Sequence, residues 1–312
     1  MAQFTGINHI REISTSSNSE LVSSIESPHP NLSISDFASS ERDNLNELLL
    51  EHGYVLLRGF KVGSEVDFEH FVREFSGRDL FSYSGGASPR TALSAGGLYT
   101  STEYPPEIRI PLHNELSYSR TFPYHLFFWC VTPAGHGGET TLADSRKILH
   151  AIEPAIVNRF KDKSICYVRN LHSDKGSGYS WQDAFETDSP AEAEHKCNII
   201  GAQFEWPDEG YLRVTQICPA TIVHPITGEE VWFNQADGFH SLFAEDRPRL
   251  ESRFGDGSKI NISDLQAIRK AIDVETLAHK WQKDDVIIID NILAAHGRMP
   301  FTGSRKILLA MT

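Results

Sequence analysis

The chain has 312 residues, of which 40% are hydrophobic and 23% are charged, and its formal net charge is −13. This composition is typical of a globular protein with room for a large core, arranged in one or two domains. No cluster of basic residues offers a stripe that could follow a phosphate backbone, so we expect no nucleic-acid partner.

The N-terminus lacks the apolar segment of a secretory signal, and no apolar run approaches the roughly 20 residues of a membrane span. The four cysteines, Cys130, Cys166, Cys197 and Cys218, lie far apart and form no CxxC pair. Their spacing favours reduced thiols over a disulfide framework or a zinc ribbon. We therefore expect a cytoplasmic protein that has no membrane partner.

The N-terminal part of the chain predicts two helices around one short strand. Residues 1–40 predict an irregular lead-in, which is rich in serine from residue 14 onward. A helix is expected at about 41–52, where leucines recur three and four residues apart. The segment YVLLRGF (54–60) predicts a strand, and the spacing of Ser64 and Asp67 predicts a capping box at the start of a second helix.

The rest of the chain predicts short strands separated by long connections. Strands are expected at 124–131, 213–225, 230–235, 285–291 and 305–311, and helices near 144–159 and 264–280. Two long polar stretches, 82–107 and 172–195, predict loops, and we expect them to form an active-site lid. Because regular βαβ alternation is missing, an antiparallel sandwich or jelly roll decorated with helices is favoured over a Rossmann-type fold.

A histidine and a glutamate stand two positions apart at His113 and Glu115, just ahead of a strongly aromatic run. If 109–116 is extended, both side chains point to the same face, as a pair of metal ligands would. The composition predicts about two such pairs by chance, and the second is His172 with Asp174. That second pair lies among glycines and serines without strand signal, so the first pair is favoured.

His296 is the candidate for a third ligand, because it follows the apolar segment 285–291 after a polar turn. A single histidine in this position is more often an ordinary hydrogen-bonded interior residue. Arg305 changes that interpretation, since burying an arginine at the start of an apolar strand is costly unless an anion pairs with it. No acidic residue lies between Asn291 and the C-terminus, so a bound carboxylate ligand is the natural partner.

Two histidines and one carboxylate on one face of a metal leave three coordination positions open. This arrangement is typical of non-heme Fe(II) oxygenases. A 2-oxo acid would occupy two of the open positions and dioxygen the third.

Three segments carry a resemblance to a known family: HNE (113–115), PAGHGGETTLADSR (133–146) and DNILAAHGRMPFTGSRK (290–306). Together they resemble the Fe(II)/2-oxoglutarate-dependent oxygenases of the taurine dioxygenase (TauD/TfdA) superfamily, and the similarity extends from residue 52 to the C-terminus. The segments SPR, YTSTEYPP, LHNELSY and VWFNQADGFH are most similar to the SyrP-type branch. That branch includes aminoacyl β-hydroxylases of specialised peptide biosynthesis.

The resemblance implies a mainly β fold with flanking helices, a double-stranded β-helix or jelly roll, in a single oxygenase domain that spans 1–312. It implies that His113, Glu115 and His296 hold Fe(II), and that 2-oxoglutarate and O2 are cosubstrates. Related halogenases replace the carboxylate ligand by a small residue, so the presence of Glu115 implies hydroxylation.

The resemblance also implies the residues that bind 2-oxoglutarate. Arg305 stands where family members bind the distal carboxylate, with Arg298 as the alternative. Thr140 stands at the threonine of the family motif G-G-[D/E]-T, whose hydroxyl contacts 2-oxoglutarate; a turn-capping hydroxyl is the alternative interpretation of this residue.

We expect the enzyme to hydroxylate an unactivated C–H of an amino acid or an amino-acid-derived substrate, free or tethered to a carrier protein, in specialised metabolite biosynthesis. The reaction would consume O2 and release succinate and CO2. Arg90 and Arg109 are candidates for gripping a carboxylate or a phosphate-linked acyl group, and Asn234 for an additional polar contact. Arginines near loops are more often ordinary solvated residues, and Asn234 is explained at least as well as a satisfied strand amide.

Other functions remain open from the sequence. Within the oxygenases, the alternatives are a catabolic dioxygenase of the taurine or carnitine type and a related desaturase or cyclase. Outside the class, a zinc hydrolase could use the same ligands, although it would leave Arg305 and Thr140 unexplained. A non-catalytic jelly-roll binding protein is the last alternative, and the oligomeric state is not predicted.

Overall fold

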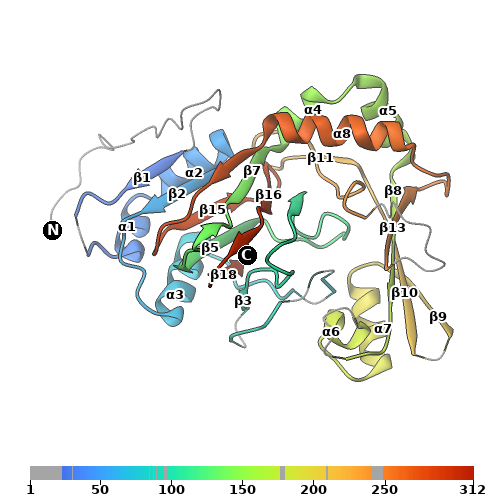
Figure 1. Cartoon of the computed structure of the whole chain (residues 1–312), viewed down its shortest axis with the longest axis horizontal. Coiled ribbons are helices and arrows are strands. Elements are labelled where there is room, and N and C mark those ends of the chain that lie inside the picture. Colours follow the sequence, from blue (N-terminus) through green and yellow to red (C-terminus); the bar gives the residue numbers. More distant parts are fainter. Residues whose placement is uncertain are drawn as a thin grey trace.

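Two facing β-sheets form the centre of the molecule (Figure 1). The computed structural model describes residues 23–29, 31–83, 85–86, 88, 90–94, 97–175, 180–208, 210–239 and 249–312. The larger sheet has the order β1 (Ser24–Glu26), β2 (Tyr54–Arg58), β15 (Val286–Asp290), β5 (His125–Thr132), β18 (Lys306–Met311) and β3 (Leu98–Thr100). The smaller sheet has the order β14 (Leu277–His279), β7 (Thr140–Asp144), β16 (Ala294–Arg298) and β4 (Ile110–His113). Except for β1 and β2, neighbouring strands of both sheets are antiparallel.

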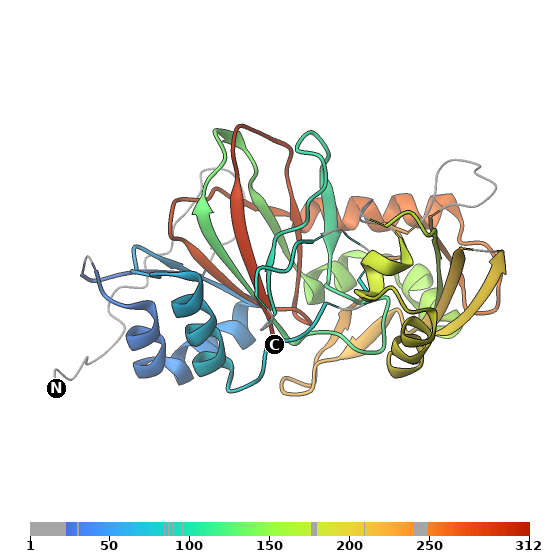
Figure 2. The same cartoon turned by 90° about the horizontal axis from the view of Figure 1, so that it is seen from below.

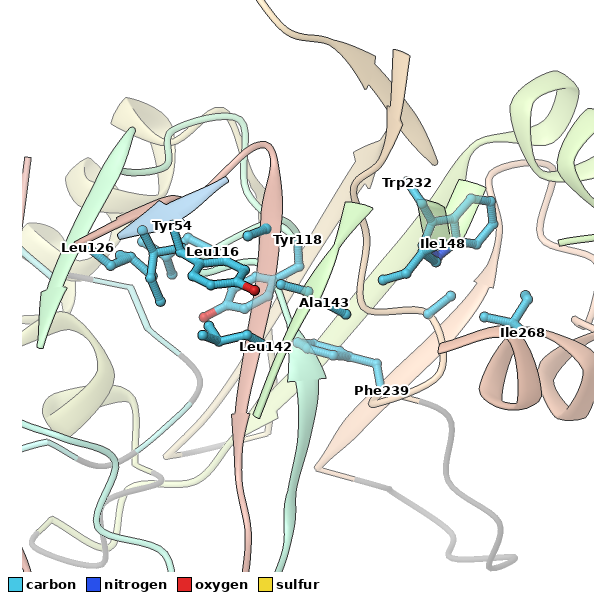
Figure 3. Packing of buried hydrophobic residues seen from close by; sticks show 14 of the residues in the cluster. Tyr54, Leu116, Tyr118, Leu126, Leu142, Ala143, Ile148, Trp232, Phe239 and Ile268 are labelled. Carbon is cyan, nitrogen blue, oxygen red and sulfur yellow. The ribbon is translucent and has the colours of Figure 1, made fainter. Parts of the chain in front are cut away.

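The inner faces of the two sheets share one apolar core. Leu126 of β5 and Leu142 of β7 belong to the same buried cluster, part of which is drawn in Figure 3. At the site end of this core, the ring of Phe128 lies 5.3 Å from that of His296 on the opposite sheet. The predicted jelly roll, mainly β with flanking helices, is therefore confirmed.

The larger sheet is buried on both faces, which explains the uninterrupted apolar run of its central strand. In β15, Val286 and Ile288 pack toward the N-terminal helices, whereas Ile287 and Ile289 pack toward the smaller sheet. Successive side chains of a strand point to opposite faces. A strand covered on both sides must therefore be apolar at every position.

Three helices, α1 (Ile34–Ser40), α2 (Arg42–His52) and α3 (Glu65–Ser76), cover the outer face of the larger sheet. The predicted capping box at Ser64 and Asp67 is present at the start of α3. Phe71 of α3 packs edge-on against Phe127 of β5, with ring centroids 6.0 Å apart. The prediction of an irregular lead-in over 1–40 is wrong for its described part, because β1 and α1 lie there; residues 1–22 lie outside the described residues.

A third sheet lies at the opposite end of the jelly roll from these helices (Figure 2). Its order is β13 (Leu250–Phe254), β8 (Ile165–Leu171), β10 (Tyr211–Cys218) and β9 (Gln203–Asp208). The helices α6 (Trp181–Phe185) and α7 (Pro190–Ile199) pack on this sheet through a small apolar cluster. They correct the prediction of a loop over 172–195, of which 176–179 lie outside the described residues.

The predicted helix near 144–159 is in fact two helices, α4 (Ser145–Ala151) and α5 (Pro154–Lys163). A proline is favoured in the first turn of a helix but not within it, so Pro154 begins a new helix. The predicted strand 213–225 is likewise divided into β10 and β11 (Thr221–Val223), and β11 pairs with β12 (Glu230–Trp232). The predicted helix 264–280 is α8 (Ile262–Glu275), and two short strands, β6 (His136–Gly137) and β17 (Phe301–Thr302), complete the fold.

All four cysteines are free, and burial raises the pKa of the Cys130 thiol to about 12. Such thiols are poor nucleophiles. None of the helices in the described part of the chain is long and apolar enough to cross a lipid bilayer.

Candidate functional site

His113, Glu115 and His296 converge at the edge where β4 pairs with β16. The two histidines are register partners across these strands, and their rings lie 4.4 Å apart. Oε2 of Glu115 lies 4.0 Å from Nε2 of His113 and 3.8 Å from Nε2 of His296. Ligand atoms each about 2.1 Å from one ion can be at most about 4.2 Å apart. These separations therefore suit a single divalent ion.

Glu115 reaches this cluster by a route that the sequence did not predict. Placing both side chains on one face of a strand required 109–116 to be extended, but β4 ends at His113. Glu115 begins a turn, and Leu116 has a left-handed φ of 55°. The carboxylate therefore approaches from a turn that folds over the end of the strand.

The histidines present their Nε2 atoms to the cluster. Nδ1 of His113 lies 2.9 Å from the carbonyl oxygen of Pro111. Because a carbonyl only accepts hydrogen bonds, Nδ1 donates its hydrogen and Nε2 keeps a lone pair for a metal. Burial, with smaller contributions from His113 and Arg90, lowers the pKa of His296 well below its ordinary value. His296 is thus neutral at neutral pH, as metal ligation requires.

Two asparagines hold the turn that carries Glu115. Oδ1 of Asn291 accepts a hydrogen bond of 2.6 Å from the backbone N–H of Glu115, and its Nδ2 donates to the carbonyl of Glu115 at 3.0 Å. In return, Nδ2 of Asn114 donates to the backbone carbonyl of Asn291 at 2.7 Å. Gln235 adds a donor to the carbonyl of Asn114 at 2.9 Å. The turn is therefore held by two separate segments, one directly after β15 and one just after β12.

Arg90 is buried against Glu115 and does not lie on the surface. Its Nη2 donates to Oε2 of Glu115 at 2.5 Å, and the two side chains are only 2% and 3% exposed. Its guanidinium also lies over the ring of Tyr83, 4.6 Å from the centroid. Burial disfavours the charge, but Glu115 and Tyr83 outweigh it and the pKa of Arg90 is raised.

A small cavity adjoins the cluster and brings together the residues expected to bind 2-oxoglutarate. His113, His296, Thr140 and Arg305 all line it. No carboxylate of the described residues forms an ion pair with Arg305, which donates only to the carbonyl of Gly138 at 3.1 Å and to Oγ of Ser101 at 3.4 Å.

Burial and neighbouring Arg298 lower the pKa of Arg305 to about 10. Arg305 is therefore cationic at neutral pH while it lacks an anion. The donor set of the cluster and this uncompensated arginine both fit a metal that carries an anionic 2-oxo acid.

The second glycine of the HGGET segment, Gly138, makes room for Arg305. Gly138 has a left-handed φ of 73°, and a Cβ added there would lie 3.1 Å from Cδ of Arg305 and 3.0 Å from Cβ of Ala134. A side chain at Gly138 would therefore crowd the arginine that enters the cavity.

Arg298, the alternative residue for the distal carboxylate, has another role. It donates to the carbonyl oxygens of four residues that lead into β4: Thr102, Tyr104, Pro105 and Ile108. Both of its Nη atoms are committed in this way, so Arg298 holds the segment 102–108 in place.

A larger cavity opens on the other side of His113 and Glu115. Its wall is mainly apolar and includes Tyr118, Trp232 and Phe239, which are labelled in Figure 3. Arg109 lies at this cavity and donates to Oδ1 of Asp273 at 3.2 Å, with its side chain 44% exposed.

Asn234 also lines the larger cavity, but its amide is committed to the backbone. It donates to the carbonyl of Ala220 at 2.9 Å and accepts from the N–H of Ala236 at 3.1 Å. The amide is therefore satisfied, as the alternative interpretation expected, although Asn234 lies after the end of β12 and not in a strand.

The two predicted lid loops differ in their relation to the cavities. The segment 82–107 contributes Tyr83, Ser88 and Tyr104 to the larger cavity and Arg90 to the smaller one; residues 84, 87, 89 and 95–96 lie outside the described part. The described residues of 172–195 line neither cavity. His172 and Asp174 likewise belong to no metal-ligand cluster of the described residues.

Several residues that support the site were missed from the sequence, among them Asn291, Asn114, Gln235 and Trp281. Asn291 and Asn114 are buried amides beside apolar residues, and buried amides need partners, so their positions did carry a signal. Trp281 donates from Nε1 to Oγ1 of Thr140 at 3.0 Å, and nothing in its surrounding sequence indicates this contact.

Comparison with known proteins agrees with the geometry. The family model described as taurine catabolism dioxygenase TauD, TfdA family matches residues 17–312. The dapdiamide synthesis protein DdaC of Enterobacter agglomerans is 33% identical over 321 residues, covering 98% of this chain and 92% of that protein. A clavaminate synthase-like protein of Arabidopsis thaliana is 33% identical over 297 residues, covering 91% and 89%.

Solved structures show the same fold at low sequence identity. PvcB of Pseudomonas aeruginosa aligns with a TM-score of 0.55 at 16% identity, covering 92% of this chain and 84% of that one. An asparagine oxygenase, solved with Fe(II), 3-hydroxyasparagine and succinate, aligns with a TM-score of 0.55 at 11% identity, covering 88% and 79%. The chain belongs to the TauD/TfdA family and is a non-heme iron oxygenase that uses Fe(II), 2-oxoglutarate and O2.

Proposed function

We propose that this oxygenase hydroxylates an unactivated C–H of an amino acid or an amino-acid-derived substrate, with His113, Glu115 and His296 as the iron ligands. The observation that carries the assignment of the ligands is the convergence of these three side chains beside a cavity that holds Arg305, a partly buried arginine with no carboxylate partner among the described residues. A structural cluster would not need that second feature.

Each of these residues has a defined task in the proposal. Iron bound there supplies the activation of O2. His113 and His296 present their Nε2 atoms, and Glu115 presents a carboxylate oxygen. Arg305 anchors the distal carboxylate of 2-oxoglutarate, and the hydroxyl of Thr140 donates to the same cosubstrate.

The larger cavity supports a substrate with a substantial apolar part. Aromatic and aliphatic side chains make up most of its wall, and Arg109 lies there with part of its guanidinium exposed. A small, fully polar substrate such as taurine has little apolar surface to pack against this wall. A small-molecule catabolic role of the taurine or carnitine type is therefore the weaker candidate.

Relatives support the same substrate class. DdaC is named for dapdiamide synthesis, and the structurally similar asparagine oxygenase was solved with a hydroxylated amino acid. The similarity of SPR (88–90) and LHNELSY (112–118) to the SyrP-type branch adds the option of a substrate tethered to a carrier protein. The presence of Glu115 among the ligands favours hydroxylation over halogenation.

The test is succinate release during aerobic incubation with Fe(II) and 2-oxoglutarate. We expect stimulation by an amino acid or by its carrier-protein thioester, with a product 16 mass units heavier than the substrate because one oxygen atom is added. Comparing free amino acids with thioesters of the same acids decides whether the substrate is tethered. His296→Ala serves as the matched control and should release no succinate.

Other outcomes identify the alternatives. Stimulation by taurine or carnitine alone would show a catabolic oxygenase, and a product two mass units lighter would show a desaturase or cyclase. Hydrolysis that needs zinc but neither O2 nor 2-oxoglutarate would contradict the proposal. So would ligand binding that survives His296→Ala without any turnover by the wild-type protein.

A further inference from the structure

Arg90 lies where the two cavities of the site meet. It lines the smaller cavity together with Thr140, His296 and Arg305. Its neighbours Tyr83 and Ser88 line the larger one. The arginine is therefore buried between a metal-ligand candidate and the space assigned to 2-oxoglutarate.

The donors of Arg90 are only partly used. Nη2 donates to Oε2 of Glu115, whereas Nε and Nη1 are buried and have no hydrogen-bond partner among the described residues. Buried guanidinium N–H groups are normally satisfied. The remaining donors of Arg90 therefore call for an acceptor that the protein itself does not supply.

The neighbouring arginines narrow the choice of acceptor. Arg298 donates from both Nη atoms to backbone carbonyls, and only its Nε lacks a partner, so Arg90 and Arg305 are the arginines of the smaller cavity that have Nη donors to spare among the described residues. Of these, only Arg90 contacts a metal-ligand candidate. A dicarboxylate that chelates the metal through one end would place that end beside Arg90 and its other end at Arg305.

We propose that Arg90 binds the 1-carboxylate of 2-oxoglutarate while it continues to hold Glu115. This inference rests on the proposed assignment of the smaller cavity to 2-oxoglutarate. One guanidinium would then join a metal ligand to the cosubstrate, and two negative groups that would repel each other at the metal share one cation.

The experiment separates the two ends of the cosubstrate. Full-length protein is loaded with Mn(II), which keeps turnover out of the measurement, and titrated calorimetrically with 2-oxoglutarate and with 2-oxopentanoate. The second acid keeps the 1-carboxylate and the 2-oxo group but lacks the distal carboxylate.

We expect Arg90→Gln to weaken the binding of both 2-oxo acids by the same factor, roughly tenfold or more. Arg90→Lys keeps the positive charge but not the bidentate geometry of the guanidinium, and should lose less affinity for both acids. Arg305→Gln should weaken the binding of 2-oxoglutarate alone. Its affinity should fall to that of 2-oxopentanoate, which lacks the distal carboxylate. Arg253→Gln, which breaks an exposed ion pair with Glu251, is the matched control and should bind both acids like the wild type.

The inference is overturned if both Arg90 variants bind Mn(II) and both acids within twofold of the wild type. It is equally overturned if only the Michaelis constant of the hydroxylated substrate rises, because Arg90 would then serve a substrate carboxylate. If Arg90→Gln no longer binds Mn(II), Arg90→Lys decides. Failure of the proposed function looks different: the wild type would not bind Mn(II), or Arg305→Gln would bind 2-oxoglutarate unchanged.

Discussion

The side-chain amide of Asn291 holds both backbone polar groups of Glu115, accepting from its N–H and donating to its carbonyl. Asn291 is fully buried. Its side-chain amide makes the two hydrogen bonds that the backbone of a neighbouring strand would otherwise make to Glu115. The position of the carboxylate at the metal site is thus set by a residue that does not itself reach the site.

We predict that Asn291→Ala weakens metal binding by about 10–100-fold, as loss of outer-shell partners typically does. It should also lower the free energy of unfolding by about 1–3 kcal/mol, because three buried backbone groups, the N–H and carbonyl of Glu115 and the carbonyl of Pro123, lose a partner. Calorimetric titration with Mn(II) and urea denaturation measure the two effects. Asn198→Ala, at an exposed asparagine of α7, is the control, and equal metal affinity in the two variants would refute the role of Asn291.

The contact between Trp281 and Thr140 predicts an effect on the binding of 2-oxoglutarate alone. Because the indole N–H occupies a lone pair of the hydroxyl oxygen, the hydroxyl hydrogen of Thr140 is left for the cavity. Trp281→Phe should raise the Michaelis constant of the cosubstrate by roughly threefold to tenfold, as loss of one net hydrogen bond would, with kcat unchanged at saturation.

Thr140→Val, which removes the hydroxyl itself, should raise that Michaelis constant at least as much. Trp206→Phe is the matched control, since the indole of Trp206 donates to Glu194 away from the site. A lowered kcat with an unchanged Michaelis constant for the cosubstrate in Trp281→Phe would argue against an orienting role for this tryptophan.

Arg298 and Arg305 should fail in different ways when they are replaced. Arg305→Met removes the candidate anchor of the distal carboxylate and should raise the Michaelis constant of the cosubstrate by about 10-fold or more. Arg298→Met frees the four carbonyls of 102–108 and should lower the free energy of unfolding by about 2–5 kcal/mol. Arg298→Met should weaken the binding of the substrate that is to be hydroxylated more than that of 2-oxoglutarate, because Tyr104 and Ile108 line the larger cavity.

Steady-state kinetics with each substrate varied in turn, together with urea denaturation, separates the two arginines. If the variant at Arg298 proved to be the one defective in 2-oxoglutarate binding, the roles assigned to the two residues would have to be exchanged.

The buried pair of Arg58 and Asp285 predicts a pH-dependent contribution to stability. Asp285 is fully buried and accepts from Nε and Nη2 of Arg58 at 2.8 and 2.6 Å. Burial disfavours its charge, but hydrogen bonds from Arg58, His279 and the N–H of Gln282 outweigh this, and the pKa of Asp285 is lowered. Removing one partner of such a pair, as in Asp285→Asn, should cost about 3–5 kcal/mol at pH 7.

The sign follows from the lowered pKa. The stability contributed by Asp285 is fully present above the unfolded pKa of about 4 and is lost as the pH falls through the native pKa. Urea denaturation should therefore show a gap between wild type and Asp285→Asn that narrows below about pH 4. A gap that stays constant down to pH 3 would show that the charge of Asp285 contributes nothing.

Local patterns predicted most of the regular elements. The strands at 54–60, 124–131 and 285–291 were predicted because burial on both faces demands apolar residues throughout. The helix α3 was predicted from its capping box and its apolar face. Errors arose where a local signal was weak: Pro154 divides a predicted helix, and α7 has almost no amphipathic pattern by which it could be told from a loop.

The side chains that the site needs can be read directly from the amino-acid sequence: two histidines and a glutamate that can ligate iron, and an arginine with no acidic neighbour between Asn291 and the C-terminus. Their arrangement is a property of the folded chain, in which His296 pairs with His113, Glu115 lies in a turn and Arg90 donates to that glutamate. These relationships join residues that lie far apart along the chain. They depend on strand register and on the packing of separate segments, which local periodicity does not encode.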